Sequence, residues 1–371
     1  MKILKEKSFL SGKVKLRIYD DFFVVESDES LKTYSSAILG GGKKFTRTFI
    51  GKKVEKNYIS ENPEKDLQEI EKKIGAIDSV GMMTACDVKN LFIKEENNVL
   101  VFLTAGVSNA SLAGEMTSVL TPCTINIYAI IDANLEEEAY VGGIITMTEA
   151  KTRALLDLDI RSVNSYRNAT GTTTDSALIA STGNGKKERY MSTGTKIGKT
   201  LGELVYEGVY NSLVVYDKNN PQRSLASRLR ERGIILEDII KAEMELFIDN
   251  DDITRDEFKS LFQNELEYYL KETNVSSLII AGLRAEEDGY RGIIPGLPKS
   301  EFEKDPIHLI ADEAIGDAIA SYIGGYRGIF EFRRVERIKP GIIGGLGPFM
   351  DDALGGLIAG ISSKIFQRIN R

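Results

Sequence analysis

The sequence has 371 residues, of which 42% are hydrophobic and 28% are charged, so it is long enough for two domains and apolar enough to bury a core in each. The formal net charge of -7 argues against nucleic-acid binding, which usually needs a basic surface. Two cysteines cannot form a disulfide framework, and the single histidine excludes a histidine-rich metal site. The charged N-terminus does not look like a secretion signal, and every long apolar run is too short or too acidic for a membrane span. We therefore expect a cytoplasmic protein.

The first two thirds of the chain alternate strand-like and helix-like patterns. The expected strands are 14–18, 22–25, 98–103, 124–131 and 176–180, and the expected helices are 63–74, 135–158 and 195–214. The first two strands flank a polar turn and predict a β-hairpin. Strands that alternate with helices predict a layered α/β domain.

A polar segment at 216–224 contains Asn-Asn-Pro and has the composition of a linker. Beyond it the hydrophobic periodicity is almost entirely helical. Thr254 and Glu257 have the spacing of a capping box and predict a helix over 255–272. We therefore expect two domains, a layered α/β domain over 1–221 and an all-α helical bundle over 222–371.

Small and polar residues gather where the expected strands of the first domain begin or end. The segment 104–109 follows the strand 98–103, and 170–175 precedes the strand 176–180, while 148–152 lies in the long helix. Ligands of α/β domains bind at strand ends, where glycine allows close approach of the backbone. Because the first domain has no histidine, any catalysis there uses carboxylate, lysine, hydroxyl or thiol groups.

Three motifs suggest phosphate binding, calcium binding or thiol chemistry, but their residues do not fit these functions. Residues 194–200 resemble a phosphate-binding loop, but only three residues separate the glycines where the loop needs four. Residues 249–254 resemble the start of a calcium loop without the glycine that turns it. Cys123 stands before an apolar strand, so we expect a small core residue.

Two acidic pairs stand in apolar, helical surroundings of the second domain. Asp312-Glu313 and Asp351-Asp352 are followed by glycines that share a helix face with the carboxylates. Buried carboxylates need partners, and a hard divalent cation such as Mg²⁺ would satisfy them. The basic segment 332–340 lies between the pairs, and its cations either neutralise a phosphate or pair with the acids.

Five segments of the first domain resemble the adenosylcobinamide amidohydrolase family in matching order. They are AGVSNA (105–110), TINI (124–127), TEAKT (148–152), GTTTD (171–175) and TGTKIGKTLGELV (193–205). The resemblance covers roughly residues 10 to 215. It implies hydrolysis of the aminopropanol amide of adenosylcobinamide to adenosylcobyric acid, a step of corrinoid salvage.

Amide hydrolysis needs a nucleophile, a base and a stabilised oxyanion. One alternative is that Glu149 or Asp175 acts as a base on water, and the other is that Lys151 activates the hydroxyl of Thr172 or Ser108. Backbone N–H groups of 105–109 or 171–174 are the candidates for holding the oxyanion. The expected substrate-binding residues are Gly106, Asn109, Asn126, Gly171 and Thr173. The sequence establishes no cofactor for this domain.

Three segments of the second domain resemble the phosphatidylglycerophosphatase A superfamily and, more closely, its α-ribazole-phosphate phosphatase branch. They are DEAIG (312–316), FRRVERIKP (332–340) and GGLGPFMDDALGGLIAG (344–360). The resemblance implies dephosphorylation of α-ribazole 5′-phosphate or of adenosylcobalamin 5′-phosphate. Glu336 departs from the superfamily pattern, which has Asp there. The expected Mg²⁺ ligands are Asp312, Glu313, Asp351 and Asp352, and the expected phosphate-binding residues are Arg333 and Lys339.

Both resemblances point to one pathway, so we expect a bifunctional enzyme of cobamide assembly with small-molecule corrinoid and α-ribazole phosphate substrates. Two alternatives remain at this point. The first is a corrinoid-binding protein without catalysis. The second is a lipid phosphatase that contacts a membrane surface through 307–330 and 341–361.

Overall fold

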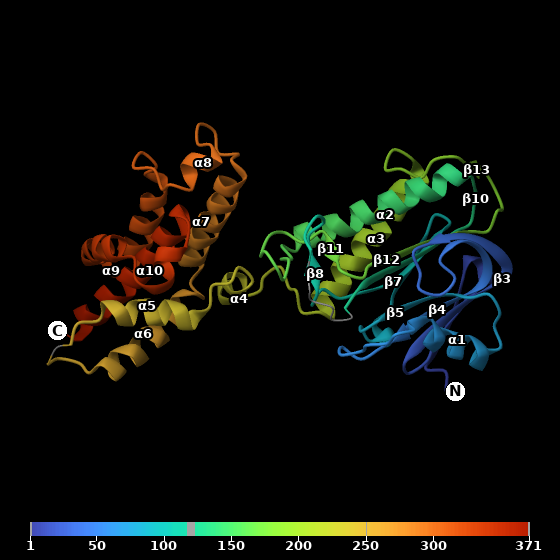
Figure 1. Ribbon diagram of the computed structural model, residues 1–371, viewed down its shortest axis with the longest axis horizontal. Coiled ribbons are helices and arrows are strands. Elements are labelled where there is room, and N and C mark those ends of the chain that lie inside the picture. The colour runs from blue at the N-terminus through green and yellow to red at the C-terminus, as the bar shows by residue number, and fades with distance from the viewer. Residues whose placement is uncertain (1, 117–122, 250, 370–371) are drawn as a thin grey trace. The chain divides into compact units, whose positions relative to one another are not determined.

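The computed structural model describes residues 2–116, 123–249 and 251–369, shown in Figure 1. They divide into two compact units, Met1–Gln222 and Arg223–Arg371, and the expected boundary after residue 221 lies next to this division. Unit 1 mixes strands and helices and unit 2 is helical, as the sequence predicted. Across the described part of the chain, none of the helices is long and apolar enough to cross a membrane.

Unit 1 is built on a mixed nine-stranded sheet. Its main path runs β1 (Lys5–Phe9), β2 (Val14–Ile18), β3 (Phe22–Ser35), β12 (Ser176–Ser181), β9 (Ile125–Ile131), β7 (Val99–Ala105) and β6 (Phe92–Glu96). β4 (Gly42–Lys53) pairs with β3 and with β5 (Val80–Thr84). β12 is parallel to β9 and antiparallel to β3, whereas β7 is antiparallel to β9. Two small ladders join β8 (Ala110–Ser111) to β11 (Gly171–Thr172) and β10 (Asn134–Leu135) to β13 (Lys187–Glu188).

Apolar side chains on both faces of the central strands explain the layers of unit 1. α2 (Glu137–Asp157) and α3 (Lys196–Val215) lie side by side against one face, where Val101 and Ile127 join their core (Figure 1). The next residues along these strands, Phe102 and Tyr128, point to the opposite face because side chains of a strand alternate. There their rings stack 4.7 Å apart in a second core shared with β2 to β5. α1 (Pro63–Ile74) packs against a further small cluster with β3 and β4.

Several expected elements of unit 1 are confirmed within a residue or two, and several further strands were not predicted from the sequence. The strands β2, β7, β9 and β12 and the helices α1, α2 and α3 were expected. β4, β5 and β6 were not, and β3 is 14 residues long where only four were expected. Its pairing with β4 shifts register between Glu26 and Leu31, and the polar residues of this stretch hide the strand in the sequence.

Unit 2 surrounds one buried helix. Its helices are α4 (Leu225–Arg230), α5 (Leu236–Leu246), α6 (Arg255–Tyr269), α7 (Thr273–Arg291), α8 (Lys299–Phe302), α9 (Ala311–Ile338) and α10 (Pro348–Ile369), with a short 3-10 turn at Gly341–Gly345. Every residue of 348–363 in α10 is buried, so this helix forms the centre of the bundle. The capping box at Thr254 and Glu257 is confirmed, although α6 ends at Tyr269 instead of residue 272.

α9 is a helical hairpin that reverses at Gly325. This glycine has φ 65° and ψ -153°, a conformation that L side chains rarely adopt. The arms 311–324 and 326–338 pack closely, because a Cβ on Gly328 would overlap the Ala320 carbonyl and one on Gly316 would overlap the Phe332 ring. The reversal therefore returns the end of the second arm to the start of the first.

Candidate functional site

The polar segments of unit 1 meet at one end of the sheet. Ala105 at the end of β7 pairs with Ile125 at the start of β9, and the first residue of β12 pairs with Asn126. The Asn126 amide donates a 2.6 Å hydrogen bond to the Met83 carbonyl near the end of β5. The loops that follow β7 and precede β9 and β12 therefore share one edge of the sheet, at the amino-terminal ends of the parallel pair β9 and β12.

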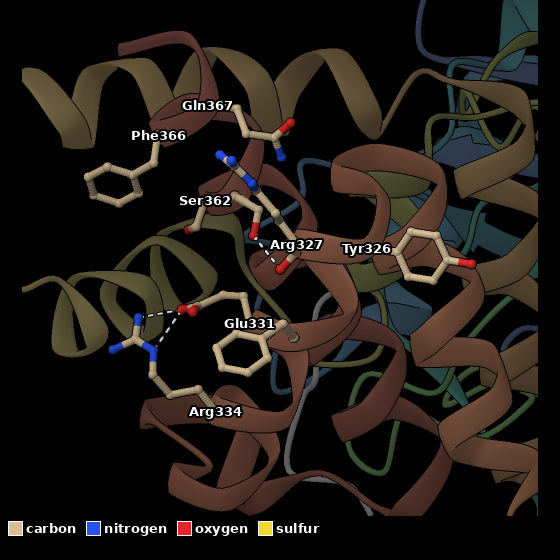
Figure 2. A pocket seen from close by; sticks show the side chains of 9 residues that line it. Tyr326, Arg327, Glu331, Arg334, Ser362, Phe366 and Gln367 are labelled. Carbon is tan, nitrogen blue, oxygen red and sulfur yellow. Dashed lines mark hydrogen bonds and ion pairs between the residues drawn. The ribbon is translucent and has the colours of Figure 1, made fainter. Parts of the chain in front are cut away.

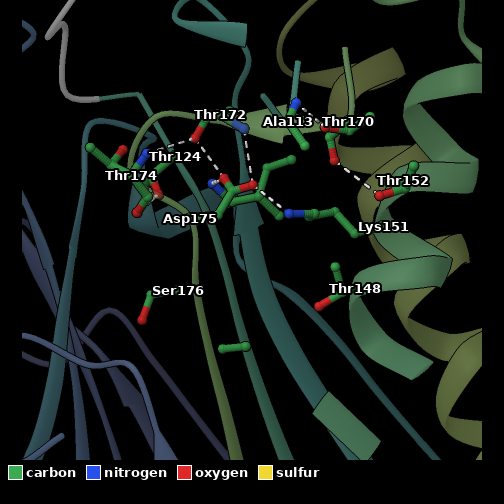
Figure 3. A network of polar contacts seen from close by, with 12 residues as sticks. Ala113, Thr124, Thr148, Lys151, Thr152, Thr170, Thr172, Thr174, Asp175 and Ser176 are labelled. Carbon is green, nitrogen blue, oxygen red and sulfur yellow. Dashed lines mark hydrogen bonds and ion pairs between the residues drawn. The ribbon is translucent and has the colours of Figure 1, made fainter. Parts of the chain in front are cut away.

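Asp175 is the centre of a network of polar contacts at this edge (Figure 3). Its Oδ2 accepts hydrogen bonds from Lys151 Nζ at 2.6 Å and from the Thr172 backbone N–H at 2.9 Å. Its Oδ1 accepts hydrogen bonds from Thr172 Oγ1 at 2.5 Å and from the Ile125 N–H at 3.0 Å. The side chains of Lys151 and Asp175 are only 12% and 15% exposed, so solvent screens their ion pair weakly. The structure thus brings together three of the predicted catalytic residues.

Gly171 makes room for this ion pair. A Cβ at this position would lie 2.5 Å from Asp175 Oδ2 and 2.9 Å from Lys151 Nζ. Any larger residue would have to displace the carboxylate or the ammonium group. The predicted role of Gly171 in close approach therefore has a steric basis, although the groups that approach it belong to the protein.

Three predicted binding residues lie in the same network. Asn109 is fully buried, and its Nδ2 donates a 2.7 Å hydrogen bond to Thr173 Oγ1. Asn109 Oδ1 is buried without a hydrogen-bond partner among the residues that the structure describes. The Thr124 hydroxyl lies 2.8 Å from the Thr174 carbonyl and 3.2 Å from Asn126 Oδ1. These contacts tie the loop after β7 to the loop before β12.

Ser108 and Gly106 lie beside two thiols. Cβ on Gly106 would lie 2.6 Å from the sulfur of Cys123 and 2.9 Å from that of Cys86, so both sulfurs face its Cα. A hydrogen bond from Cys86, followed by bonds from the hydroxyl and N–H of Ser108, lowers the pKa of the Cys123 thiol to about 6. Cys123 is buried, as expected for a core residue, and its thiol interacts with that of Cys86. No local pattern in the sequence indicates this contact, because 37 positions separate the two cysteines.

Glu149 lies apart from these groups. It is exposed on α2, and its carboxylate makes no hydrogen bond or ion pair within the described parts of the chain. Lys151 is two positions later and therefore points to a different side of the helix.

The acidic residues of unit 2 converge where the two ends of the α9 hairpin meet the start of α10. Asp312, Asp351 and Asp352 are 2%, 5% and 6% exposed. Burial raises the pKa of Asp312 and of Asp351 to about 6. Burial, with the nearby charges of Asp351, Asp312 and Glu336, raises the pKa of Asp352 to about 8. Lys339 Nζ lies 2.6 Å from Asp351, and it follows the second arm directly.

Two of the predicted residues of unit 2 pair with each other. Arg333 lies 2.5 Å from Asp317, 3.2 Å from Glu336 and 3.5 Å from Glu313. Glu313 is 43% exposed, so its carboxylate faces Arg333 and solvent and does not join the three buried aspartates. Glu313 stays a predicted ligand, and its carboxylate pairs with Arg333 at the surface.

Glu286 on α7 is a member of this region that the sequence analysis missed. Its carboxylate accepts hydrogen bonds from the N–H groups of Gly347 at 3.1 Å and Met350 at 3.0 Å, at the start of α10. Burial raises the pKa of Glu286 to about 7, and the charge of Asp351 adds to this effect. Glu286 therefore holds the turn that carries Asp351 and Asp352.

The donor set of unit 2 is suited to a hard cation, since it consists of carboxylate oxygens. In the described ranges, no three carboxylate, thiol or imidazole groups are arranged as a preformed metal site. Mg²⁺ is usually held by one or two carboxylates together with water and substrate phosphate oxygens. The buried aspartates are therefore the groups of unit 2 that could hold a hard cation such as Mg²⁺.

The sequence model of the adenosylcobinamide amidohydrolase family matches residues 8–221, which is more than half of the chain. The chain belongs to this family. Its segments that resembled the family include the loops at the edge of the sheet that carry Asn109, Thr172 and Asp175, and the turn of α2 that carries Lys151. The resemblance expected for unit 1 is confirmed, and the protein is an amidohydrolase.

Curated relatives and solved structures show further similarities. An adenosylcobinamide amidohydrolase of Methanosarcina mazei is 32% identical over 203 residues, which cover 52% of this chain and 94% of that protein. The uncharacterized protein MJ1330 of Methanocaldococcus jannaschii is 38% identical over 130 residues, 34% of this chain and 98% of that protein. The crystal structure of the low temperature requirement C protein from Listeria monocytogenes covers 40% of this chain and 95% of its own, with 20% identity and a TM-score of 0.35.

Proposed function

We propose that unit 1 hydrolyses the aminopropanol amide of adenosylcobinamide at the edge of the sheet where Asp175 holds Lys151 and Thr172. The observation that carries this proposal is the Asp175 carboxylate, which accepts hydrogen bonds from both side chains within the matched family region. A carboxylate, an ammonium group and a hydroxyl in contact supply an acceptor, a donor and a nucleophile for acyl transfer.

The contacts favour the Thr172 hydroxyl over free water as the nucleophile. Asp175 already accepts four hydrogen bonds, so it has little capacity left to orient a water molecule. In the proposed reaction Thr172 Oγ1 bonds to the amide carbon as its proton passes to Asp175. Lys151 donates a proton to the leaving amine nitrogen as the C–N bond breaks, and the proton on Asp175 then returns to Lys151. Water hydrolyses the ester and restores the hydroxyl.

Substitution of each residue of the ion pair between Lys151 and Asp175 tests the proposal. Asp175→Asn and Lys151→Met are each expected to lower kcat for adenosylcobyric acid formation by at least about 100-fold, as loss of general acid–base chemistry usually does. Lys199→Met is the matched control, because Lys199 forms an exposed pair with Glu203 and is expected to be neutral. Wild-type rates in both site variants would contradict the assignment. A comparable loss in Glu149→Gln, with activity retained in Asp175→Asn, would place the base on α2 instead.

We also propose that unit 2 is a metal-dependent phosphomonoesterase that acts on α-ribazole 5′-phosphate or adenosylcobalamin 5′-phosphate. The supporting observation is the set of three nearly buried aspartates beside Lys339. Asp312, Asp351 and Asp352 would hold Mg²⁺, which would offset the charge of the phosphoryl oxygens. The ammonium group of Lys339 lies beside Asp351. Glu286 holds the start of α10, which carries Asp351 and Asp352.

A chelator is expected to stop phosphate release, and added Mg²⁺ is expected to restore it. Asp352→Ala is expected to abolish phosphate release and to leave amide hydrolysis nearly unchanged, whereas Asp288→Asn on the exposed side of α7 is the control. Full activity in enzyme shown to be metal-free by elemental analysis would contradict the proposal. Phosphatidylglycerophosphate belongs in the same assay, because its selective turnover in the presence of vesicles would favour a lipid phosphatase at a membrane surface.

A further inference from the structure

A cavity of about 410 Å³ opens in unit 2 beside the tip of the α9 hairpin and the last turns of α10 (Figure 2). Its lining includes Arg327, Phe330, Arg334, Ser362, Phe366 and Gln367. Ser362 is ten residues, or about 15 Å along the helix, from Asp352. The cavity is therefore separate from the acidic cluster, and its volume is that of an ordinary small-molecule site.

Aromatic side chains form the apolar part of the cavity. Phe330 is 81% exposed, although exposed phenylalanine on a helix costs free energy in water. Phe366 is half-buried, and its ring stacks on Phe258 at a centroid distance of 5.2 Å, which fixes its position. One fixed ring and one exposed ring line the same cavity, and they offer apolar surface to a planar ligand.

The charged side chains of the cavity favour an anion. Arg334 Nε lies 2.8 Å from Glu331, and its NH1 donates to the Leu246 carbonyl at 2.9 Å, so this guanidinium is already held. Arg327 has no carboxylate partner among the residues that the structure describes. Figure 2 shows its guanidinium next to the Gln367 amide. The surplus positive charge is therefore that of Arg327.

Two buried polar side chains lie behind the wall of the cavity. Ser362 is 2% exposed and Glu243 on α5 is 1% exposed, and the Ser362 hydroxyl interacts with the Glu243 carboxylate. Ser362 Oγ and Glu243 Oε2 are both shielded from solvent. They therefore belong to the wall, and the groups open to a ligand are the two aromatic rings and Arg327.

We propose that this cavity binds a small planar aromatic anion. The ring packs against Phe330 and Phe366, and the anionic group pairs with Arg327. Neither the amide hydrolysis nor the phosphatase proposal assigns a role to these residues, so the inference stands independently of both.

Naphthalene-2-sulfonate and its neutral analogue naphthalene-2-sulfonamide are suitable probes, because they have the same ring and nearly the same shape. In titration calorimetry with the full chain, the sulfonate is expected to bind about tenfold more tightly than the sulfonamide, as one charge-assisted contact implies. Arg327→Gln is expected to abolish this preference. Arg47→Gln, which removes an exposed arginine of unit 1, is expected to keep it.

Phe330→Ala is expected to weaken both probes about tenfold, whereas Phe45→Ala, at an exposed phenylalanine of β4, is expected to weaken neither. Circular dichroism confirms that each variant is folded. The proposal is overturned if neither probe binds the wild type, or if Arg327→Gln and Phe330→Ala bind both probes unchanged. It is also overturned if Phe330→Ala changes only the oligomeric state, since the exposed rings would then be a contact between copies of the chain.

Discussion

Glu243→Gln is expected to stabilise unit 2, and to do so increasingly as the pH rises. The side chain is 1% exposed, and this burial raises its pKa to about 8, whereas the unfolded chain has a pKa of about 4.3. The folded state therefore binds the proton more tightly, and the stability of the wild type falls as the pH rises from about 4 to 8. At about 1.4 kcal/mol for each pKa unit, the full difference is worth roughly 5 kcal/mol.

The measured gain in the free energy of unfolding should be smaller than this limit. Glu243 Oε2 is buried without a hydrogen-bond partner in the described residues, and the N–H donors of a glutamine amide would be buried next to this position. We expect a gain of roughly 2–4 kcal/mol at pH 8 and at most about 1 kcal/mol at pH 5. Hydrogen-exchange mass spectrometry of α5 and α10 peptides in urea measures the free energy of unfolding of this unit in the full chain. Glu237→Gln, an exposed change on the same helix, is the control. Equal effects at both pH values, or destabilisation at pH 8, would refute the reasoning.

Substitutions at three further positions test the two sites. Gly171→Ala is expected to lower kcat for amide hydrolysis at least about tenfold, because the alanine methyl group would push Asp175 away from Lys151. Unchanged kinetics would argue against a role of this ion pair in catalysis. Thr172→Ser is expected to retain amide hydrolysis and Thr172→Val to lose it, with hydroxylamine trapping of an acyl-enzyme only in the former; activity in Thr172→Val would favour water attack. Glu286→Ala is expected to destabilise the start of α10 by about 1–3 kcal/mol, seen as faster hydrogen exchange there.

The elements that the sequence predicted have local signals that decide their structure. α1 begins with Pro63 and buries Leu67 and Ile70 on one face, and its bounds agree with the expected ones. β4 lacked such a signal, because its first half is largely polar and it depends on long-range pairing with β3 and β5. The reversal at Gly325 was also hidden, since helical periodicity on both sides of a glycine resembles one continuous helix.

The candidate site of unit 1 was predictable in its composition and less so in its contacts. Asp175 stands in a polar segment before an expected strand and Lys151 stands in an expected helix, so the sequence indicated both residues but not their contact. The helical repeat also separates Glu149 from Lys151 by about 200°, which already places the two on different sides of α2. The contact of Cys86 with Cys123 depends on how β5 and β9 pack, and no local pattern encodes it.

The position of β12 between β3 and β9 has a consequence for synthesis on the ribosome. Ser35 of β3 pairs with Leu178 of β12, about 140 positions later in the chain. At about 5–20 residues per second, translation takes roughly 7–30 s to reach β12 after β3 has been made. During this interval the edge of β3 that β12 will cover can pair with strands of other nascent chains. A pause in translation before residue 181, or binding of a chaperone during that interval, should therefore affect the yield of native protein. A pause of the same length within unit 2 should affect the yield less, because the helices of that unit contact nearer neighbours in sequence.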